Sequence, residues 1–150
     1  MNWLVLGSGD KGWEYMLEET AQKYSSHMRM ITAYHEPLSH RMYASADFLL
    51  MPSRVEPCGL NQLYAMRYGT IPMVRRTGGL QDTVADMGEK DGFGICFTHA
   101  SIEDIQQSID RALHVYRDNS SLGLFRERMM KINHSWEQTV QEYSDLYNSI

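Results

Sequence analysis

Short apolar runs alternate with amphipathic stretches along the first two thirds of the chain, and this alternation limits the possible folds more than any other feature. The apolar runs are typical of buried strands and cover residues 3–7, 28–33, 48–51, 71–74 and 94–97. The stretches between them are typical of helices, at residues 11–25, 37–46 and 59–68. This order predicts βαβ units, a mainly parallel sheet and helices on both of its faces.

Four loops follow predicted strands and are expected to share the carboxyl edge of the sheet, where ligands bind in such folds. They cover residues 7–12, 34–37, 52–59 and 75–80. Arg54, Arg75 and Arg76 are in these loops, so positive charge is expected at this edge.

The last third of the chain is predicted to form three further helices, because serine, a frequent N-cap, precedes each of three stretches with apolar residues at helical spacing. The expected caps are Ser101, Ser120 or Ser121, and Ser135. Apolar residues at helical spacing are expected to pack inward from these helices and from residues 59–68; they include Leu60, Tyr64, Ile102, Leu124, Ile132, Trp136, Val140, Tyr143, Leu146 and Tyr147.

Charge is distributed unevenly along the chain of 150 residues, which is long enough for one domain. The net charge of the chain is −5. Residues 27–76 hold six arginines and three acids and so carry +3, which leaves −8 on the rest of the chain. The overall charge gives no attraction to nucleic acid, but a local positive region suits a small anionic ligand. Arginines scattered over a solvated surface are the alternative explanation.

Cellular context is expected to be cytoplasmic. No apolar run approaches the roughly 20 residues of a membrane span, and the first residues do not read as a secretion leader. Cys58 and Cys96 are interpreted as two reduced thiols, with a disulfide as the alternative.

The segment GSGDKG, residues 7–12, spells G-x-G-x-x-G after an apolar run. Glu36 follows at about the distance of a ribose-binding acid in a dinucleotide fold. These residues favour an NAD-type dinucleotide-binding domain as one hypothesis.

A second loop points to a different phosphate site. PSRVEPCGLNQLYAM, residues 52–66, runs from a predicted strand into a helix that begins at glycine. The first N–H groups of that helix have no partner within it and can bind a phosphate, and glycine allows close approach. Glu56, just before the turn, is a candidate ligand for sugar hydroxyls, with an ion pair to Arg54 or another arginine as the alternative.

The stretch PSRVEPCGLNQLYAMRYGTIPMVRRTGGLQDTV, with LGSGD, AYHEPLSHRMYASADFLLMPSR and SWEQTVQEYSDLY, resembles the starch/glycogen synthase family. These are retaining ADP-glucose glucosyltransferases of the GT-B fold, built from two Rossmann-like domains. The resemblance covers nearly the whole chain. It implies that residues 1–150 are the single C-terminal, nucleotide-sugar-binding domain, a three-layer parallel α/β fold with extra C-terminal helices. The first strand and loop of that domain and the N-terminal acceptor domain would be absent.

The resemblance also assigns roles to individual residues. Tyr34, beside His35, matches the residue that packs on adenine, and Glu56 matches the catalytic-site acid near the glucosyl hydroxyls. Tyr64 stands where the broad GT-B pattern has a second acid, and Gln62 is a possible supporting residue. Two loops match the sugar and diphosphate contacts: Cys58, Gly59, Leu60 and Asn61 (often threonine in the family), and Arg76, Thr77, Gly78 and Gly79.

The implied reaction is transfer of glucose from ADP-glucose to the non-reducing end of an α-1,4-glucan, with retention. No obligatory cofactor or metal is implied, because helix N–H donors and cations stabilise the departing diphosphate. The expected partners are ADP-glucose, the glucan and the missing N-terminal domain, in the cytoplasm or a plastid stroma. The isolated chain is expected to bind ADP weakly and to be inactive.

A non-enzymatic alternative is an interaction module. Trp136, Tyr143 and Tyr147 in the last predicted helix would then drive self-association, while the sequence leaves the oligomeric state undefined.

Overall fold

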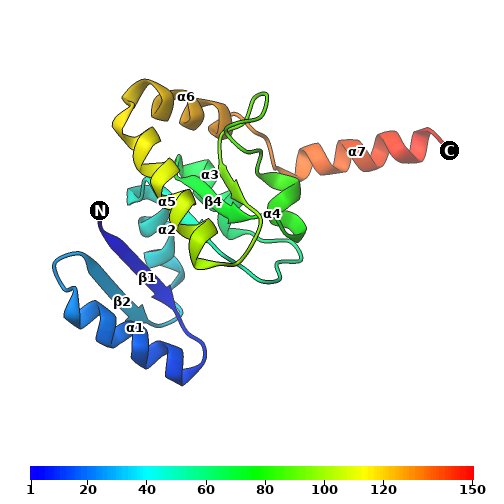
Figure 1. Ribbon diagram of the computed structural model, residues 1–150. Helices are drawn as coiled ribbons and strands as arrows, with labels where there is room; N and C mark the ends of the chain where they lie inside the picture. Colours follow the sequence, from blue (N-terminus) through cyan, green and yellow to red (C-terminus); the bar gives the residue numbers. More distant parts are fainter. The chain divides into compact units, whose positions relative to one another are not determined.

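The computed structural model describes all residues from 1 to 150, which divide into two compact units, Met1–Ser45 and Ala46–Ile150. Each unit has a parallel sheet with helices (Figure 1). The α/β fold with parallel strands is as predicted. The strands pair in two groups, β1 with β2 and β3 with β4 and β5. That the chain acts as a single domain stays a prediction.

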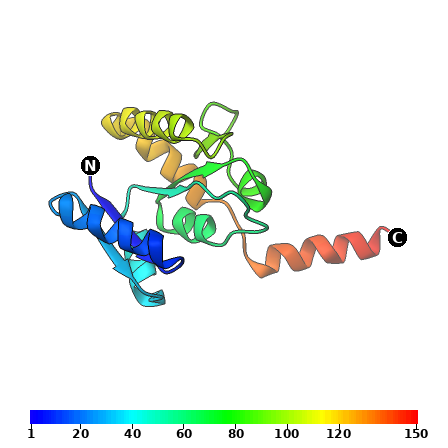
Figure 2. The same ribbon diagram turned by 60° about the horizontal axis from the view of Figure 1, so that its bottom comes forward.

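The first unit is one βαβ segment followed by a helix. Its elements are β1 (Trp3–Gly7), α1 (Lys11–Lys23), β2 (Met28–Thr32) and α2 (Glu36–Ser45). Trp3 to Gly7 pair in parallel register with Met28 to Thr32, and α1 lies alongside the two strands (Figure 2). Asp10 starts α1 by accepting the N–H groups of Gly12 and Trp13, as N-cap aspartates commonly do.

The second unit begins with a three-stranded sheet of order β3-β4-β5. Its elements are β3 (Phe48–Met51), α3 (Asn61–Tyr68), β4 (Ile71–Arg75), α4 (Gly78–Thr83), β5 (Ile95–Phe97), α5 (Ile102–Arg117), α6 (Asn119–Met130) and α7 (Trp136–Asn148). In the central strand, residues 71–74 are all buried, as is usual where helices cover both faces of a parallel sheet.

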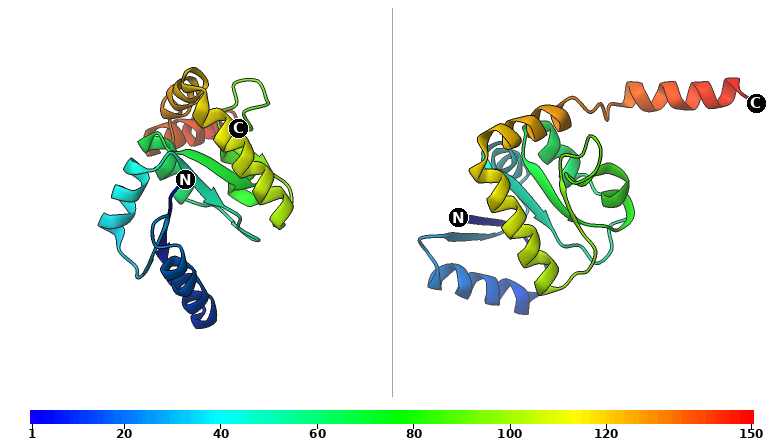
Figure 3. Two further views of the ribbon diagram at one scale, coloured as in Figure 1. Left: turned by 60° about the vertical axis from the view of Figure 1, so that its left-hand side comes forward. Right: turned by 45° about the horizontal axis from the view of Figure 1, so that its top comes forward.

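The core of the second unit joins the sheet to its helices. Its fully buried side chains include Met66, Ile71, Val74, Leu80 and Met129. Figure 3 shows α5 beside the sheet, and α6 packs against α3 and α5. Arg126 of α6 donates to the carbonyl of Gly69, where α3 ends in a left-handed turn with φ of 84°. Glycine ends helices in this way because it adopts positive φ without strain.

Several element bounds differ from the predictions. The helix predicted from residue 59 begins at Asn61, because Gly59 adopts a φ of 74°. The predicted loop 75–80 contains the start of α4. Asp118, rather than Ser120 or Ser121, caps α6, because its carboxylate accepts the Ser120 N–H.

The predicted inward stripe of α7 is exposed, with Trp136 81% exposed and Tyr147 72% exposed. The same correction applies to six other residues that were expected to pack inward and are exposed: Leu60, Tyr64, Ile102, Tyr116, Leu124 and Ile132. Residues in the first turn of a helix, such as Ile102, often lie beyond the edge of the surface that the helix covers.

Candidate phosphate and sugar site

The loop after β3 carries Glu56, and the side chain of Arg75, the last residue of β4, holds the backbone of this loop. Arg75 donates from Nε to the carbonyl of Ser53 at 2.7 Å and from Nη2 to the carbonyl of Arg54 at 2.5 Å. Ser53 in turn donates from Oγ to Glu56 Oε2 at 3.3 Å. No local pattern predicts these roles of Arg75 and Ser53, because the two residues meet only where the ends of two strands come together.

Glu56 is half-buried and forms no ion pair, so the predicted alternative of an Arg54–Glu56 pair is wrong. The arginine in the same loop contributes its backbone carbonyl to Arg75 instead. A carboxylate held by one weak hydroxyl contact retains most of its capacity to accept hydrogen bonds.

The start of α3 has no side-chain cap. Leu60 occupies the N-cap position without a side-chain hydrogen bond, and Gly59 before it has a φ of 74°. Asn61 and Leu60 are exposed, and so is Cys58. Backbone N–H groups at an uncapped helix start can donate to an anion, and the helix dipole favours negative charge there.

The second glycine-bearing loop lies directly against the first. Gly79 donates its N–H to the carbonyl of Glu56 at 3.1 Å. A Cβ on Gly78 would stand 2.0 Å from the Glu56 carbonyl oxygen, and one on Gly79 only 1.9 Å from that of Cys58. Only glycine permits such an approach. The two loops, which were predicted to share one edge of the sheet, therefore lie in contact through Gly78 and Gly79 on one side and Glu56 and Cys58 on the other.

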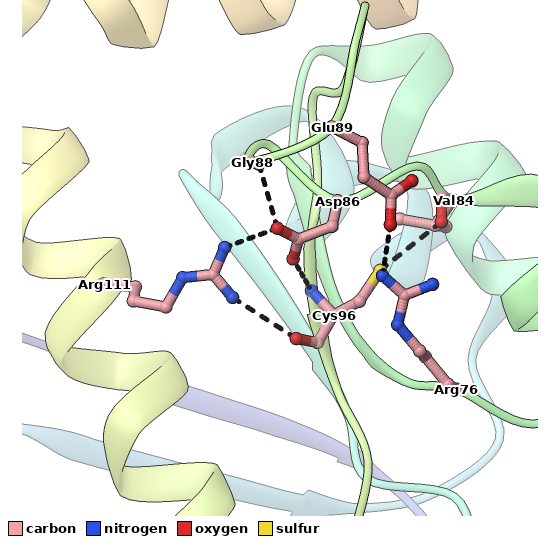
Figure 4. Close-up of polar contacts among 7 residues, drawn as sticks. All are labelled: Arg76, Val84, Asp86, Gly88, Glu89, Cys96 and Arg111. Carbon is pink, nitrogen blue, oxygen red and sulfur yellow. Dashed lines mark hydrogen bonds and ion pairs between the residues drawn. The ribbon is translucent and has the colours of Figure 1, made fainter.

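Arg76 points toward the loop that follows α4. Its guanidinium contacts Glu89 at 2.5 Å (Figure 4), and this hydrogen bond raises the pKa of Arg76. The side chain stays about one third exposed. A guanidinium has five N–H donors, so one carboxylate does not exhaust them.

Asp86 anchors the same loop from within (Figure 4). It accepts from Arg111 at 2.7 Å, from the N–H of Cys96 at 2.7 Å and from the N–H of Gly88 at 2.9 Å. Burial alone would raise the pKa of Asp86, but these donors outweigh it and lower the pKa. The sequence motifs did not indicate Asp86, because its distant partners Cys96 and Arg111 come from β5 and α5.

The two cysteines are free, as predicted, and their environments differ. Cys58 is exposed beside the candidate site, whereas Cys96 is buried in β5. Burial raises the pKa of the Cys96 thiol to about 11. Thiols of this kind are unreactive near neutral pH, because the thiolate is the nucleophile.

Tyr34 lies in the first unit, after β2, and is 88% exposed. Its ring is therefore not part of the core of that unit. Its neighbour His35 accepts the Leu38 N–H on Nδ1 at 3.1 Å, inside the first turn of α2. Glu36 is the first residue of α2, a position where acids stabilise a helix through its dipole.

The GSGDKG turn is occupied by its own carboxylates. Asp10 Oδ1 accepts the N–H groups of Gly12 and Trp13, and Glu14 accepts the N–H of Gly9 at 2.8 Å. Lys11 pairs with Glu14 at 2.6 Å. Two negative groups therefore stand where a pyrophosphate would have to bind, which disfavours the dinucleotide hypothesis.

Neither a metal nor a membrane is indicated by the side chains. No group of three or more His, Cys, Asp or Glu is placed to hold a metal ion. No helix combines the length and the apolar character that a membrane span requires.

A parallel α/β fold with glycine loops at strand ends and an uncapped helix start defines a domain suited to a phosphorylated ligand. Residues 2–129 match the family model of glycosyl transferases group 1, and the chain belongs to that family. This confirms the α/β glycosyltransferase fold class.

Two relatives show which glycosyltransferases this chain is similar to. The chain is 52% identical over 150 residues to the glycogen synthase of Flavobacterium johnsoniae, covering 100% of this chain and 32% of the relative. It is 45% identical over 147 residues to that of Rhodospirillum rubrum, covering 97% and 30%. The chain thus spans about a third of the length of these relatives.

A solved structure gives the same picture. The catalytic domain of starch synthase IV from Arabidopsis thaliana, bound to ADP and acarbose, matches with a TM-score of 0.84 and 34% identity. The match covers 97% of this chain and 31% of that one. The predicted resemblance to starch and glycogen synthases is confirmed, and these relatives lend no support to the dinucleotide alternative.

Proposed function

We propose that this chain is the donor-binding part of a glycogen or starch synthase of the GT-B type. The proposed enzyme is a hexosyltransferase that transfers glucose from ADP-glucose to the non-reducing end of an α-1,4-glucan with retention. The observation that carries the proposal is the uncapped start of α3, with Glu56 and the Gly78–Gly79 turn packed around it.

The diphosphate is proposed to bind at residues 59–61. Their N–H groups lie at a helix start without a side-chain cap, and the helix dipole favours an anion there. Arg76 supplies a cation from the neighbouring loop, with Glu89 occupying part of its guanidinium. The backbone of Gly78 and Gly79 and the side chains of Cys58 and Thr77 would line the rest of the site.

Glu56 is proposed to hold the hydroxyls of the transferred glucose. Ser53 contacts one carboxylate oxygen at 3.3 Å, and no cation neutralises the group. Both oxygens can therefore accept from sugar hydroxyls and fix the ring relative to the diphosphate. Such orientation lowers the entropic part of the barrier to transfer.

The chemistry asked of the chain is mainly electrostatic. When the bond from glucose to the diphosphate breaks, negative charge grows on the leaving phosphate. Fixed N–H donors and Arg76 stabilise that charge without reorganisation, so the proposal includes no obligatory cofactor. The acceptor glucan is proposed to be bound by a separate N-terminal domain, in the cytoplasm or a plastid stroma.

Tyr34 is proposed to stack on adenine. Its exposed ring suits stacking, which accepts any base and so does not by itself select ADP. Support for adenosine as the nucleoside comes from the starch synthase relative, which was solved with ADP.

The proposal is tested by replacing the matching segment of the Flavobacterium johnsoniae glycogen synthase with this chain. The chimera should transfer glucose from ADP-glucose to glycogen, and Glu56→Gln should lower kcat by about a hundredfold or more. Glu103→Gln, an exposed acid of α5, is the matched control and should leave kcat unchanged. A folded chimera without transferase activity, or equal activity in both variants, would contradict the proposal.

A further inference from the structure

The side chain of Gln62 lies beneath the candidate site and is completely buried. Its Nε2 donates to the carbonyls of Cys58 and Gly59, at 3.3 and 2.9 Å. It also reaches Thr83 Oγ1 at 3.1 Å, 21 residues further along the chain. One amide group thus contacts both the turn before α3 and the last residue of α4.

Thr83 extends this connection to the second glycine loop. Its hydroxyl donates to the carbonyl of Gly79 at 2.6 Å. Gly79 in turn donates its N–H to Glu56 and packs against the carbonyl of Cys58. The hydrogen bonds therefore form a closed path from the Glu56 loop through Gln62 and Thr83 to the Gly79 turn and back.

Gln62 also fits tightly under Gly59. A Cβ on Gly59 would lie 2.6 Å from Gln62 Oε1 and 2.9 Å from Nε2. The positive φ of Gly59 and the amide beneath it thus belong to one arrangement. Changing either would change the direction in which the N–H groups of residues 59–61 point.

The amide group of Gln62 is engaged on one side only. Its Nε2 has three acceptors, whereas Oε1 is buried and has no hydrogen-bond partner. The unpaired acceptor lowers stability, and loss of the Nε2 donor from the carbonyls of Cys58 and Gly59 would lower it as well. The contribution of the amide therefore lies in its donor side, which contacts both loops of the candidate site.

We infer that Gln62, acting with Thr83, is a positioning residue that holds the two glycine loops in register for the nucleotide diphosphate. This inference rests on the proposed function. Gln62 does not touch the ligand; it fixes the carbonyls of Cys58 and Gly59, so that the N–H groups at the start of α3 are oriented before the diphosphate binds. Preorganised donors gain affinity because they are not ordered on binding.

The test compares Gln62→Met and Thr83→Val with Thr83→Ser, which keeps the hydroxyl, in the 150-residue chain. Gln107→Met, on an exposed face of α5, is the matched control. Three quantities are measured: the thermal unfolding midpoint, the calorimetric Kd for ADP, and the chemical shifts and exchange rates of the Gly59 and Gly79 amides.

Gln62→Met and Thr83→Val are expected to weaken ADP binding about tenfold while the unfolding midpoint changes by only a few degrees. Both should shift the Gly59 amide, although Thr83 belongs to another helix. Thr83→Ser and Gln107→Met should bind ADP like the unchanged chain. Should Gln62→Met fail to fold, the contrast between Thr83→Val and Thr83→Ser decides the matter.

Unchanged ADP affinity in Gln62→Met and Thr83→Val would overturn the inference, as would an unmoved Gly59 amide in Thr83→Val. Failure of the unchanged chain to bind ADP is a different result. It would count against the proposed function, and the Gly59 and Gly79 amides would still show whether Gln62 couples the two loops.

Discussion

Two turns in this chain carry glycines just before a helix, and they are held in opposite ways. In the GSGDKG turn, a Cβ on Gly7 or Gly9 would meet nothing within 4 Å. That turn is fixed by the carboxylates of Asp10 and Glu14, which accept backbone N–H groups. In the turn before α3, the glycines of the neighbouring loop pack against backbone, and no side chain caps the helix.

The difference teaches that glycine spacing alone does not identify a phosphate loop. The first turn satisfies its N–H donors internally and adds negative charge at the helix start. The second leaves its helix start uncapped and draws its rigidity from Gly78, Gly79 and the amide of Gln62. At the first turn a phosphate would have to compete with carboxylates that already accept the N–H groups. At the second turn no side-chain cap accepts them, so a phosphate can.

The largest expected effect comes from adding a methyl group at Gly79. Because the new Cβ would stand 1.9 Å from the Cys58 carbonyl oxygen, the backbones of two loops must separate. We expect Gly79→Ala to lower the free energy of unfolding by about 3 kcal/mol and to abolish ADP binding. Chemical denaturation and calorimetry measure the two effects.

Gly9→Ala is the matched control in the other turn. Its Cβ would enter open space, so the free energy of unfolding should change by about 0.5 kcal/mol or less. Equal losses of unfolding free energy in Gly79→Ala and Gly9→Ala would contradict the difference between the two turns.

A smaller effect is expected from Asp10→Ala. The substitution removes the acceptor of the Gly12 and Trp13 N–H groups, and loss of an N-cap costs about 1 kcal/mol. ADP affinity should stay the same, because the phosphates are proposed to bind at the start of α3 and not at this turn. Circular dichroism on heating and calorimetry with ADP would check both statements, and a large loss of ADP affinity would count against the assignment.

The smallest effect is a difference in the pH response of the two turns. The hydrogen bond from Lys11 and that from the Gly9 N–H lower the pKa of Glu14. A lowered pKa means that this carboxylate stabilises the fold fully above its unfolded value of 4.5. The stabilisation is lost as the pH falls below 4.5 and through the folded pKa.

Hydrogen exchange of the Gly9 and Gly59 amides, measured across that pH range, distinguishes the two turns. The Gly9 amide should lose protection as the pH falls below 4.5, relative to the intrinsic exchange rate. The Gly59 amide should not follow it, because its turn is held by the amide group of Gln62 and not by a carboxylate. A shared midpoint for Gly9 and Gly59 would show that one carboxylate governs both turns.

Much of the fold could be predicted from local patterns. Short buried runs such as residues 71–74 and the N-cap at Ser101 are encoded within a few residues. Helix α4 was missed because GGLQDT begins with two glycines and reads as a turn. Its glycines are set by the tertiary contact with residues 56–58, which no local pattern reveals.

The candidate site was predictable to a similar extent. Glu56, Gly59 and Gly79 follow from the motifs, and the structure brings their loops together. The supporting contacts of Arg75 and Thr83 join residues more than twenty positions apart. The apolar stripe of α7 has the right spacing for packing, yet spacing does not reveal what covers it.

The central claim is that the start of α3, and not the GSGDKG turn, holds the nucleotide phosphates. A titration of the ¹⁵N-labelled chain with ADP, followed amide by amide, tests it most directly. The amides of Gly59, Leu60 and Asn61 should shift with a common Kd, while those of Gly9 and Gly12 stay in place. Shifts at Gly9 and Gly12 with none at residues 59–61 would contradict the claim.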